Sequence, residues 1–164
     1  MFIINNGLDN SVYAYMDWKK ITNKNSAQYR LREEYRKTKN NLFDAKGLAD
    51  IFSRKVIACT SKFGNIGDEI EITFKDGVNY WNNKGTLFAI IGDHKNPKDS
   101  DYCEWGHLFK GGQCGVVEFI VDSNKINNIK NVFPLLKKNP VVKIEKTGVN
   151  FFNKINEYLT TGHI

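Results

Sequence analysis

The chain of 164 residues has the length of one globular domain, with 41% hydrophobic and 13% aromatic residues. This composition excludes a disordered or fibrous protein, and no apolar run reaches the length of a membrane span. The 24 basic and 18 acidic residues give a net charge of +6, which favours an anionic partner such as nucleic acid, an anionic membrane surface or an acidic polymer. The basic residues are scattered and form no recognition motif, which argues against nucleic acid.

The N-terminal residues Met1 to Asn6 lack the basic region and the roughly 7 to 15 apolar residues of a secretory signal. We therefore expect synthesis in the cytoplasm, with lysis, an injection particle or a longer polypeptide as the route to any action outside the cell. The three cysteines cannot all pair within one chain. A bond between Cys103 and Cys114 is conceivable, but without a secretion signal we expect free thiols, with Cys59 a small buried residue in its strand.

The first elements along the chain are a possible strand at Val12 to Met16 and a helix. Ser26 can cap this helix, which is expected to run through about Tyr35, because Ala27, Leu31 and Tyr35 recur at helical spacing.

Five further strands are expected at residues 56–60, 69–74, 86–92, 115–121 and 141–144, where apolar residues alternate or run together. Asn150 can cap a final helix, whose apolar stripe should pack on the strands and consists of Phe151, Phe152, Ile155, Tyr158 and Leu159. Short strands with glycine-rich turns, and helices only at the two ends, predict a mainly β fold built on a small barrel of six strands. We expect one domain, with an N-terminal extension and helix at 1–50, the barrel at 51–146 and the C-terminal helix at 147–164.

Two carboxylates lie in or at the end of strongly apolar strands. Glu118 interrupts the run Val116 to Val121, and Asp93 ends the run Leu87 to Gly92. A carboxylate in such a place must be paired, hydrogen-bonded or protonated with a raised pKa, and the protonated state suits a general acid. A Glu118 that turns to solvent or pairs with a lysine would be purely structural. We expect both carboxyl groups in one cleft, within about 10 Å of each other, the range that two-carboxylate glycosidase chemistry permits.

Polar and aromatic side chains gather in the loop that follows Asp93. Tyr102 and Trp105 are suited to stacking on a sugar ring, and His107 follows them in the sequence. For Trp105 the favoured interpretation is an anchor that packs the loop on the barrel. The set His94, Cys103, His107 and Cys114 contains metal-ligand types, but its spacing matches no compact zinc pattern. We therefore expect no metal and no cofactor.

Four stretches carry a family resemblance: Val56 to Cys59, Phe63 to Ile72, Ile91 to Lys95 and Gly115 to Asp122. Together with Tyr13 to Leu31 they resemble Gram-positive phage and cell-wall-associated proteins, which in turn are similar to double-psi β-barrels of the three-aspartate and rare-lipoprotein-A type. The resemblance covers most of residues 13–122.

The resemblance implies a double-psi-type barrel related to lytic transglycosylases that cut the peptidoglycan glycan strand. Asp93 resembles the middle acid of the three-aspartate pattern and Glu118 the last, whereas Cys59 or Thr60 stands where the first would be. Asp93 is then the expected general acid, Glu118 its partner or replacement, and Lys95 the residue that tunes their pKa values.

Two other functions remain open from the sequence. One is a non-catalytic module that binds cell-wall glycan or builds part of a phage tail. The other is an intracellular toxin or nucleic-acid-acting protein, suggested by the basic charge and the missing signal. In the preferred hypothesis the partner is peptidoglycan or an anionic cell-wall polymer, and the protein acts at the cell wall.

Overall fold

The computed structural model describes residues 1–4, 9–11, 15–75, 85–96, 102–108, 113–125 and 140–163. The strands are β1 (Phe2–Ile3), β2 (Asp9–Ser11), β3 (Tyr15–Asp17), β4 (Asp50–Ile51), β5 (Arg54–Cys59), β6 (Asp68–Phe74), β7 (Thr86–His94), β8 (Tyr102–Cys103), β9 (Gly106–Leu108), β10 (Gln113–Gly115), β11 (Glu118–Val121) and β12 (Val141–Asn150). The α-helices are α1 (Ala27–Arg36) and α4 (Phe151–Thr161), and short 3₁₀ helices are η1 (Trp18–Lys20), η2 (Ser61–Phe63) and η3 (Ser123–Lys125).

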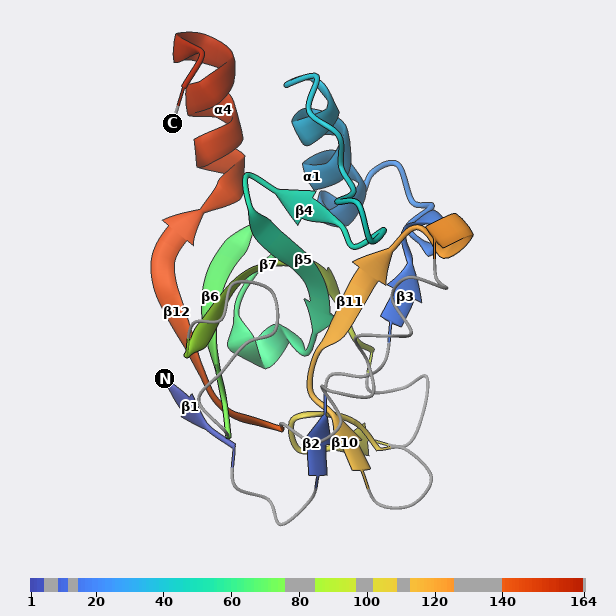
Figure 1. Ribbon diagram of the computed structural model, residues 1–164, viewed down its shortest axis with the longest axis vertical. Coiled ribbons are helices and arrows are strands. Elements are labelled where there is room, and N and C mark those ends of the chain that lie inside the picture. The colour runs from blue at the N-terminus through green and yellow to red at the C-terminus, as the bar shows by residue number, and fades with distance from the viewer. Residues whose placement is uncertain are drawn as a thin grey trace.

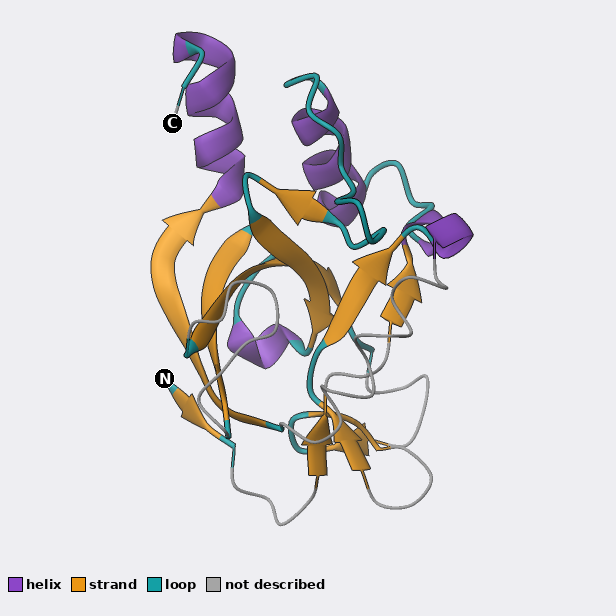
Figure 2. Cartoon of the chain, in the orientation of Figure 1, coloured by secondary structure: helices purple, strands orange, loops and turns teal. Residues whose placement is uncertain are grey.

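The described part of the chain is mainly β with two α-helices, as the sequence predicts, and Figure 2 shows strands in the body of the molecule with the helices at its edge. The main sheet is mixed and follows the order β1-β12-β6-β7-β5-β11-β3, with β4 paired to β5. A smaller sheet has the order β2-β10-β9-β8. Among the described strands, the main sheet is curled but not closed into a barrel, because β1 and β3 at its two ends do not pair with each other.

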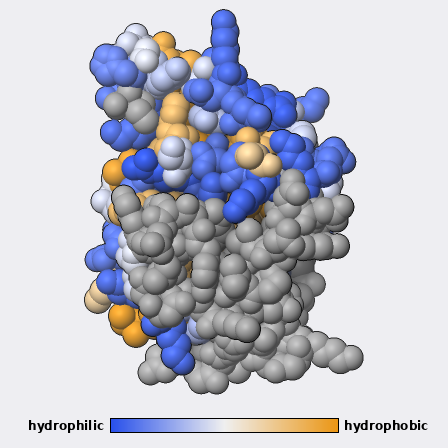
Figure 3. Space-filling model, in the orientation of Figure 1, coloured by the Kyte–Doolittle hydropathy of each residue, from blue (hydrophilic) through white to orange (hydrophobic). Residues whose placement is uncertain are grey.

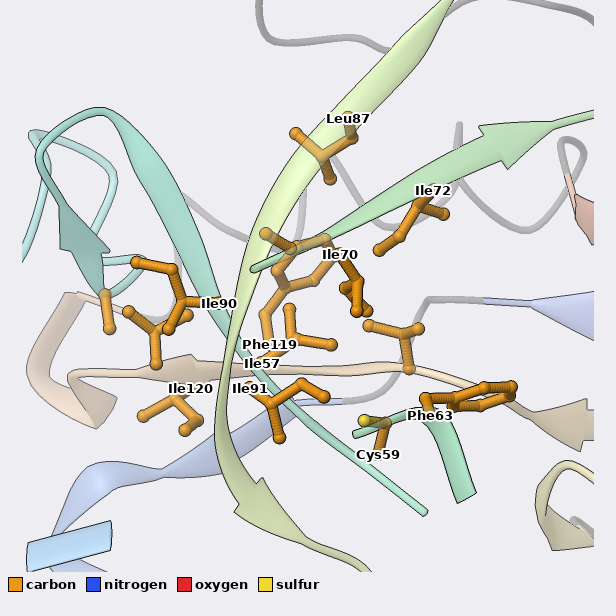
Figure 4. Close-up of a cluster of buried hydrophobic side chains, with 14 of the residues drawn as sticks. Ile57, Cys59, Phe63, Ile70, Ile72, Leu87, Ile90, Ile91, Phe119 and Ile120 are labelled. Atoms are coloured by element: carbon orange, nitrogen blue, oxygen red, sulfur yellow. The ribbon is translucent and has the colours of Figure 1, made fainter. Parts of the chain in front are cut away.

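The hydrophobic core fills the concave side of the curled sheet. Figure 4 shows Ile57 from β5, Ile70 from β6, Ile91 from β7 and Phe119 from β11 pointing toward one another, and all four are fully buried. The alternation in β6 places Ile70, Ile72 and Phe74 inward, as the sequence pattern predicts. This packing fixes the positions of β5, β7 and β11, and therefore of the residues at the ends of these strands.

The expected strand at 115–121 is divided between the two sheets. β10 pairs with β9 and β2 in the small sheet, whereas β11 pairs with β5 and β3 in the main sheet. The chain crosses from one sheet to the other at Val116 and Val117, which are both fully buried and belong to no strand. The small sheet is thereby tied directly to the end of β11.

Both helices begin at the residues that the sequence predicts. The Ser26 side chain accepts a hydrogen bond from the backbone N–H of Tyr29 at 3.2 Å, and the Asn150 side chain accepts one from Phe152 at 3.0 Å. β12 continues to Asn150, well beyond the predicted end at 144, because it pairs with β6 as far as Asp68. The possible strand at 12–16 is seen as β3 from Tyr15, and residues 12–14 lie outside the described part.

The last helix packs over a shorter stretch than predicted. Phe151 and Ile155 are buried and Phe152 is half-buried, but Leu159 is 41% exposed. Figure 1 shows the reason: α4 starts at the edge of the sheet and projects away from it, next to α1. Its outer half contacts the β4–β5 hairpin instead, where the ring of Phe52 lies between Tyr35 of α1 and Tyr158 of α4, with ring centroids 5.2 Å apart in both pairs.

The described surface on the face shown in Figure 3 is predominantly hydrophilic, and its apolar areas are small. Among the described residues, no helix is both long enough and apolar enough to cross a membrane.

Candidate functional site

The sheet register brings Asp93 and Glu118 to the two sides of one residue. Ala58 in β5 pairs with Asp93 of β7 on one side and with Glu118 of β11 on the other. Neighbouring strands lie about 4.8 Å apart, so the backbones of the two acidic residues are roughly 10 Å apart across the sheet. Paired residues project to the same face of a sheet. The small side chain of Ala58 leaves open the space between them.

A β-bulge at Gly92 sets this register. Ile57 pairs with Ile91, but Ala58 pairs with Asp93, so β7 has one extra residue at this point. A Cβ atom at Gly92 would collide with the side chain of Val56 and press on Ile120. Glycine is therefore required where the strand bends, and the bend aims Asp93 out of the core.

The Asp93 carboxyl group is held by one of its two oxygens. Oδ1 accepts hydrogen bonds from Nε2 of Gln28 at 3.1 Å and from the backbone N–H of His94 at 2.9 Å. Both of these hydrogen bonds end on Oδ1. Burial raises the pKa of Asp93, the two hydrogen bonds oppose this rise, and the negative charge of Glu118 adds to it. The raised pKa favours a protonated carboxyl group, whose proton would be on Oδ2.

Glu118 belongs to a buried ion pair. Its Oε1 lies 2.7 Å from Nζ of Lys95 and 3.3 Å from Nδ1 of His107. The Lys95 side chain is only 2% exposed, and its ammonium group also donates to the carbonyl of Gly115 at 3.1 Å. Burial lowers the pKa of Lys95, and the carboxylate of Glu118 partly offsets this effect. Glu118 thus serves as the counter-charge of a buried lysine. Asp93 instead accepts hydrogen bonds from two uncharged donors, the Gln28 side chain and the backbone of His94.

Both acids line one pocket of about 270 Å³, which we call the acid pocket. Its lining consists of Met16, Lys20, Ala58, Asp93, His94, Lys95, Asn96, His107 and Glu118. Four residues proposed from the sequence therefore meet here: Asp93, Glu118, Lys95 and His107. The pocket combines a carboxyl group of raised pKa, an ion pair and an imidazole, which is a set suited to moving a proton near a bound polar ligand.

Trp105, one of the two aromatic residues proposed for sugar stacking, is not among the residues that line this pocket. The ring of Trp105 stacks on Phe63 with centroids 5.8 Å apart and contacts Phe2 edge-on at 6.0 Å, while Nζ of Lys62 lies 4.5 Å from its centre. Trp105 is therefore an anchor of its loop, because both of its faces are covered by the protein. Tyr102 lies in β8, and its side chain is outside the described part.

The expectation of three free thiols is wrong for two of them. Cys103 and Cys114 form a disulfide that joins β8 to β10, with Cα atoms 6.1 Å apart. The pairing in the small sheet brings these two residues together, which residue spacing alone does not reveal. Cys59 is free and fully buried as predicted, and burial raises the pKa of its thiol to about 12.

Cys59 is therefore not available to a ligand, because its side chain is fully buried in the core. Thr60 caps η2 with its hydroxyl group, which accepts from the backbone of Lys62.

The possible metal ligands have other partners. Cys103 and Cys114 are bonded to each other, and Nε2 of His94 lies 2.9 Å from the carbonyl oxygen of Gly64. Within the described residues, no group of three His, Cys, Asp or Glu side chains is arranged to hold a metal ion.

The N-terminal segment supplies site residues that the sequence does not indicate. Met16 of β3, Lys20 of η1 and Gln28 of α1 reach the pocket or its acid. They are 65 or more residues from Asp93 in the chain, and a lysine or glutamine on a helix surface carries no signal of such a contact. The parallel pairing of β3 with β11 is what brings this segment to the site.

No protein-family model matches the sequence, and comparisons with curated proteins and with solved structures likewise find no match.

Proposed function

We propose that this protein cleaves the glycan strand of peptidoglycan as a lytic transglycosylase, with Asp93 as the general acid. The observation that carries the proposal is a partly buried carboxyl group of raised pKa that shares one pocket with an ion-paired carboxylate. Glycoside cleavage needs an acid that is still protonated near neutral pH, and burial together with a neighbouring negative charge is the usual way to obtain one.

The chemistry follows from the two environments. Oδ2 of Asp93 gives its proton to the glycosidic oxygen as the bond from that oxygen to C1 of the muramyl sugar breaks. The 6-hydroxyl of the same sugar then attacks C1 and closes an anhydro ring, and its proton returns to Asp93. The carboxylate of Glu118 stabilises the positive charge that develops on the sugar, so no carboxylate is needed to activate water. Lys95 holds the Glu118 carboxylate in place through their ion pair.

The disulfide and the charge support a place of action outside the cytoplasm. A disulfide persists in oxidising surroundings and is rare in cytosolic proteins, which favours the cell wall over an intracellular target. The net charge of +6 favours adsorption to the anionic wall polymers. Both points count against the intracellular toxin.

We also propose that the main sheet is a variant of the double-psi arrangement. Two parallel pairings, β5 with β7 and β3 with β11, support this assignment, because parallel neighbours cannot be joined by hairpins and require crossing connections.

A second candidate is a module that binds wall glycan without cleaving it. It is favoured by the incomplete acid set, since the fully buried Cys59 and the capping residue Thr60 occupy the place of the first acid. The two candidates share the pocket and differ only in whether Asp93 transfers its proton.

The deciding experiment is mass spectrometry of the fragments released from purified cell walls. Wild-type protein should release anhydromuramyl products, whereas Asp93→Asn should reduce their yield at least 100-fold, because the amide keeps the shape and has no acidic proton. Asp122→Asn is the matched control, since Asp122 does not line this pocket, and it should leave the yield unchanged.

The pH dependence has a defined sign. Asp93 must be protonated, so the rate should fall as the pH rises through its raised pKa. Release of ordinary reducing ends would indicate hydrolysis, and full activity in Asp93→Asn would refute the assignment. Wall binding without any released product would leave the binding module as the function.

A further inference from the structure

Asp93 lies where two pockets meet. The second pocket, of about 210 Å³, is lined by Lys20, Ile21, Thr22, Asn23, Ser26, Gln28 and Asp93, and we call it the Lys20 pocket. Lys20 and Asp93 line both pockets, so the acid marks their boundary. The volume is several times the roughly 30 Å³ that one water molecule occupies in the liquid.

The lining of the Lys20 pocket is almost entirely polar. It contains the hydroxyl group of Thr22 and the amide groups of Asn23 and Gln28, and Ile21 is the apolar residue among those named. The hydroxyl group of Ser26 is already engaged, because it donates to the carbonyl oxygen of Asn23 and accepts from the backbone of Tyr29. Lys20 is exposed, and its ammonium group interacts electrostatically with Asp17 but forms no salt bridge with any residue in the described part of the chain. Hydroxyl and amide groups suit a saccharide, and an available ammonium group suits a carboxylate.

We propose that the Lys20 pocket binds the saccharide on the opposite side of the scissile bond from the acid pocket, and that Lys20 pairs with a carboxylate carried by that part of the substrate. This inference rests on the proposed function. A general acid protonates the oxygen that joins two sugars, so a sugar site must lie on each side of it. Peptidoglycan has suitable carboxylates on its peptide stems and on those lactyl groups that carry no stem.

Gln28 connects the two parts of this site. It lines the Lys20 pocket and donates from Nε2 to Oδ1 of Asp93. The hydrogen bond occupies Oδ1, so Oδ2 is the oxygen that would meet the bridging oxygen of the glycan. The N-terminal segment therefore forms one half of the substrate site and also positions the acid.

The test is NMR titration of the ¹⁵N-labelled Asp93→Asn protein, which keeps the pocket and prevents cleavage. The two probes are a soluble peptide-bearing muropeptide tetrasaccharide and chitotetraose, which has the same backbone and no carboxylate. The muropeptide should shift the amide signals of Thr22, Asn23 and Gln28. Adding Lys20→Met should weaken muropeptide binding about fivefold, the upper range for one exposed ion pair, and leave chitotetraose binding unchanged.

Lys19→Met is the matched control, because Lys19 is an exposed neighbour that lines neither pocket, and it should have no effect. The inference is overturned if neither probe binds, if the shifts avoid residues 20–28, or if Lys20→Met behaves like Lys19→Met. Binding that depends on Lys20 in a protein that releases no anhydro products would refute the catalytic proposal and leave this subsite standing. If the protein releases anhydro products but Lys20→Met does not weaken muropeptide binding, the catalytic proposal stands and the Lys20 subsite is refuted.

Discussion

Two carboxyl groups on neighbouring parts of one sheet have opposite surroundings. Asp93 receives neutral donors on one oxygen, and burial raises its pKa. Glu118 has a buried ammonium group at 2.7 Å, so removing its charge would leave Lys95 without a counter-ion. The same substitution, carboxyl to amide, should therefore have different effects on stability at the two positions.

We predict that Glu118→Gln lowers the free energy of unfolding by about 3 kcal/mol, the usual effect of removing one partner of a buried ion pair. The sequence alone leaves open a gain in stability for a carboxylate buried without a partner, but Lys95 is such a partner. Urea unfolding at neutral pH measures the change. Adding Lys95→Met should recover much of the loss, because it removes the unpaired charge as well.

Glu157→Gln serves as the matched control for this measurement. Glu157 forms an ion pair with Lys154 on the surface of α4, and its side chain is 52% exposed, so its loss should change the stability little. Equal stability of Glu118→Gln and the wild-type protein would show that the Lys95–Glu118 pair is not formed in solution.

At the scale of elements, α4 stabilises the protein through its first turns. Phe151 and Ile155 are buried, whereas Leu159, in the outer half of the helix, is 41% exposed. We predict that Ile155→Ala lowers the free energy of unfolding by about 2 to 4 kcal/mol, while Leu159→Ala changes it by less than about 0.5 kcal/mol. Thermal unfolding of the two variants measures this directly, and a larger effect at Leu159 would mean that the outer half of α4 packs differently.

The elements that the sequence predicts well are those set by local chemistry. Ser26 and Asn150 identify the helix starts because a capping side chain bonds to its own helix two or three residues later. The division of the strand at Val116 was not predictable, because two different sheets compete for a continuous apolar run. The exposure of Leu159 was also not predictable, because the apolar stripe gives the face of the helix that packs but not how far along the helix the packing extends.

The two acidic residues of the site could be predicted from the sequence, but the other residues that line its pockets could not. Asp93 and Glu118 are conspicuous because a carboxylate in an apolar strand needs a partner, and the register then places both beside Ala58. Lys20 and Gln28 are ordinary surface residues of an N-terminal segment, and only the pairing of β3 with β11 brings them to Asp93. Trp105 has an aromatic ring suited to sugar stacking, but in the structure this ring stacks on Phe63 instead.

In the molecule as a whole, the small sheet completes the site that the main sheet begins. β9 carries His107, which contacts Glu118, and β10 ends at Gly115, whose carbonyl oxygen accepts from Lys95. The disulfide between Cys103 and Cys114 connects β8 and β10, the two strands that flank β9. It therefore holds two contacts of the buried ion pair in place.

We predict that replacing both bridged cysteines by serine lowers the free energy of unfolding by about 2 to 3 kcal/mol, as expected for a cross-link that closes a short loop. Thiol labelling with iodoacetamide tests the pairing itself. Native protein should not react, because Cys59 is fully buried and its pKa of about 12 leaves almost no thiolate at neutral pH. Denatured protein should show one thiol per chain without reductant and three with it. Three thiols in unreduced denatured protein would contradict the disulfide and remove the support that it gives to action outside the cytoplasm.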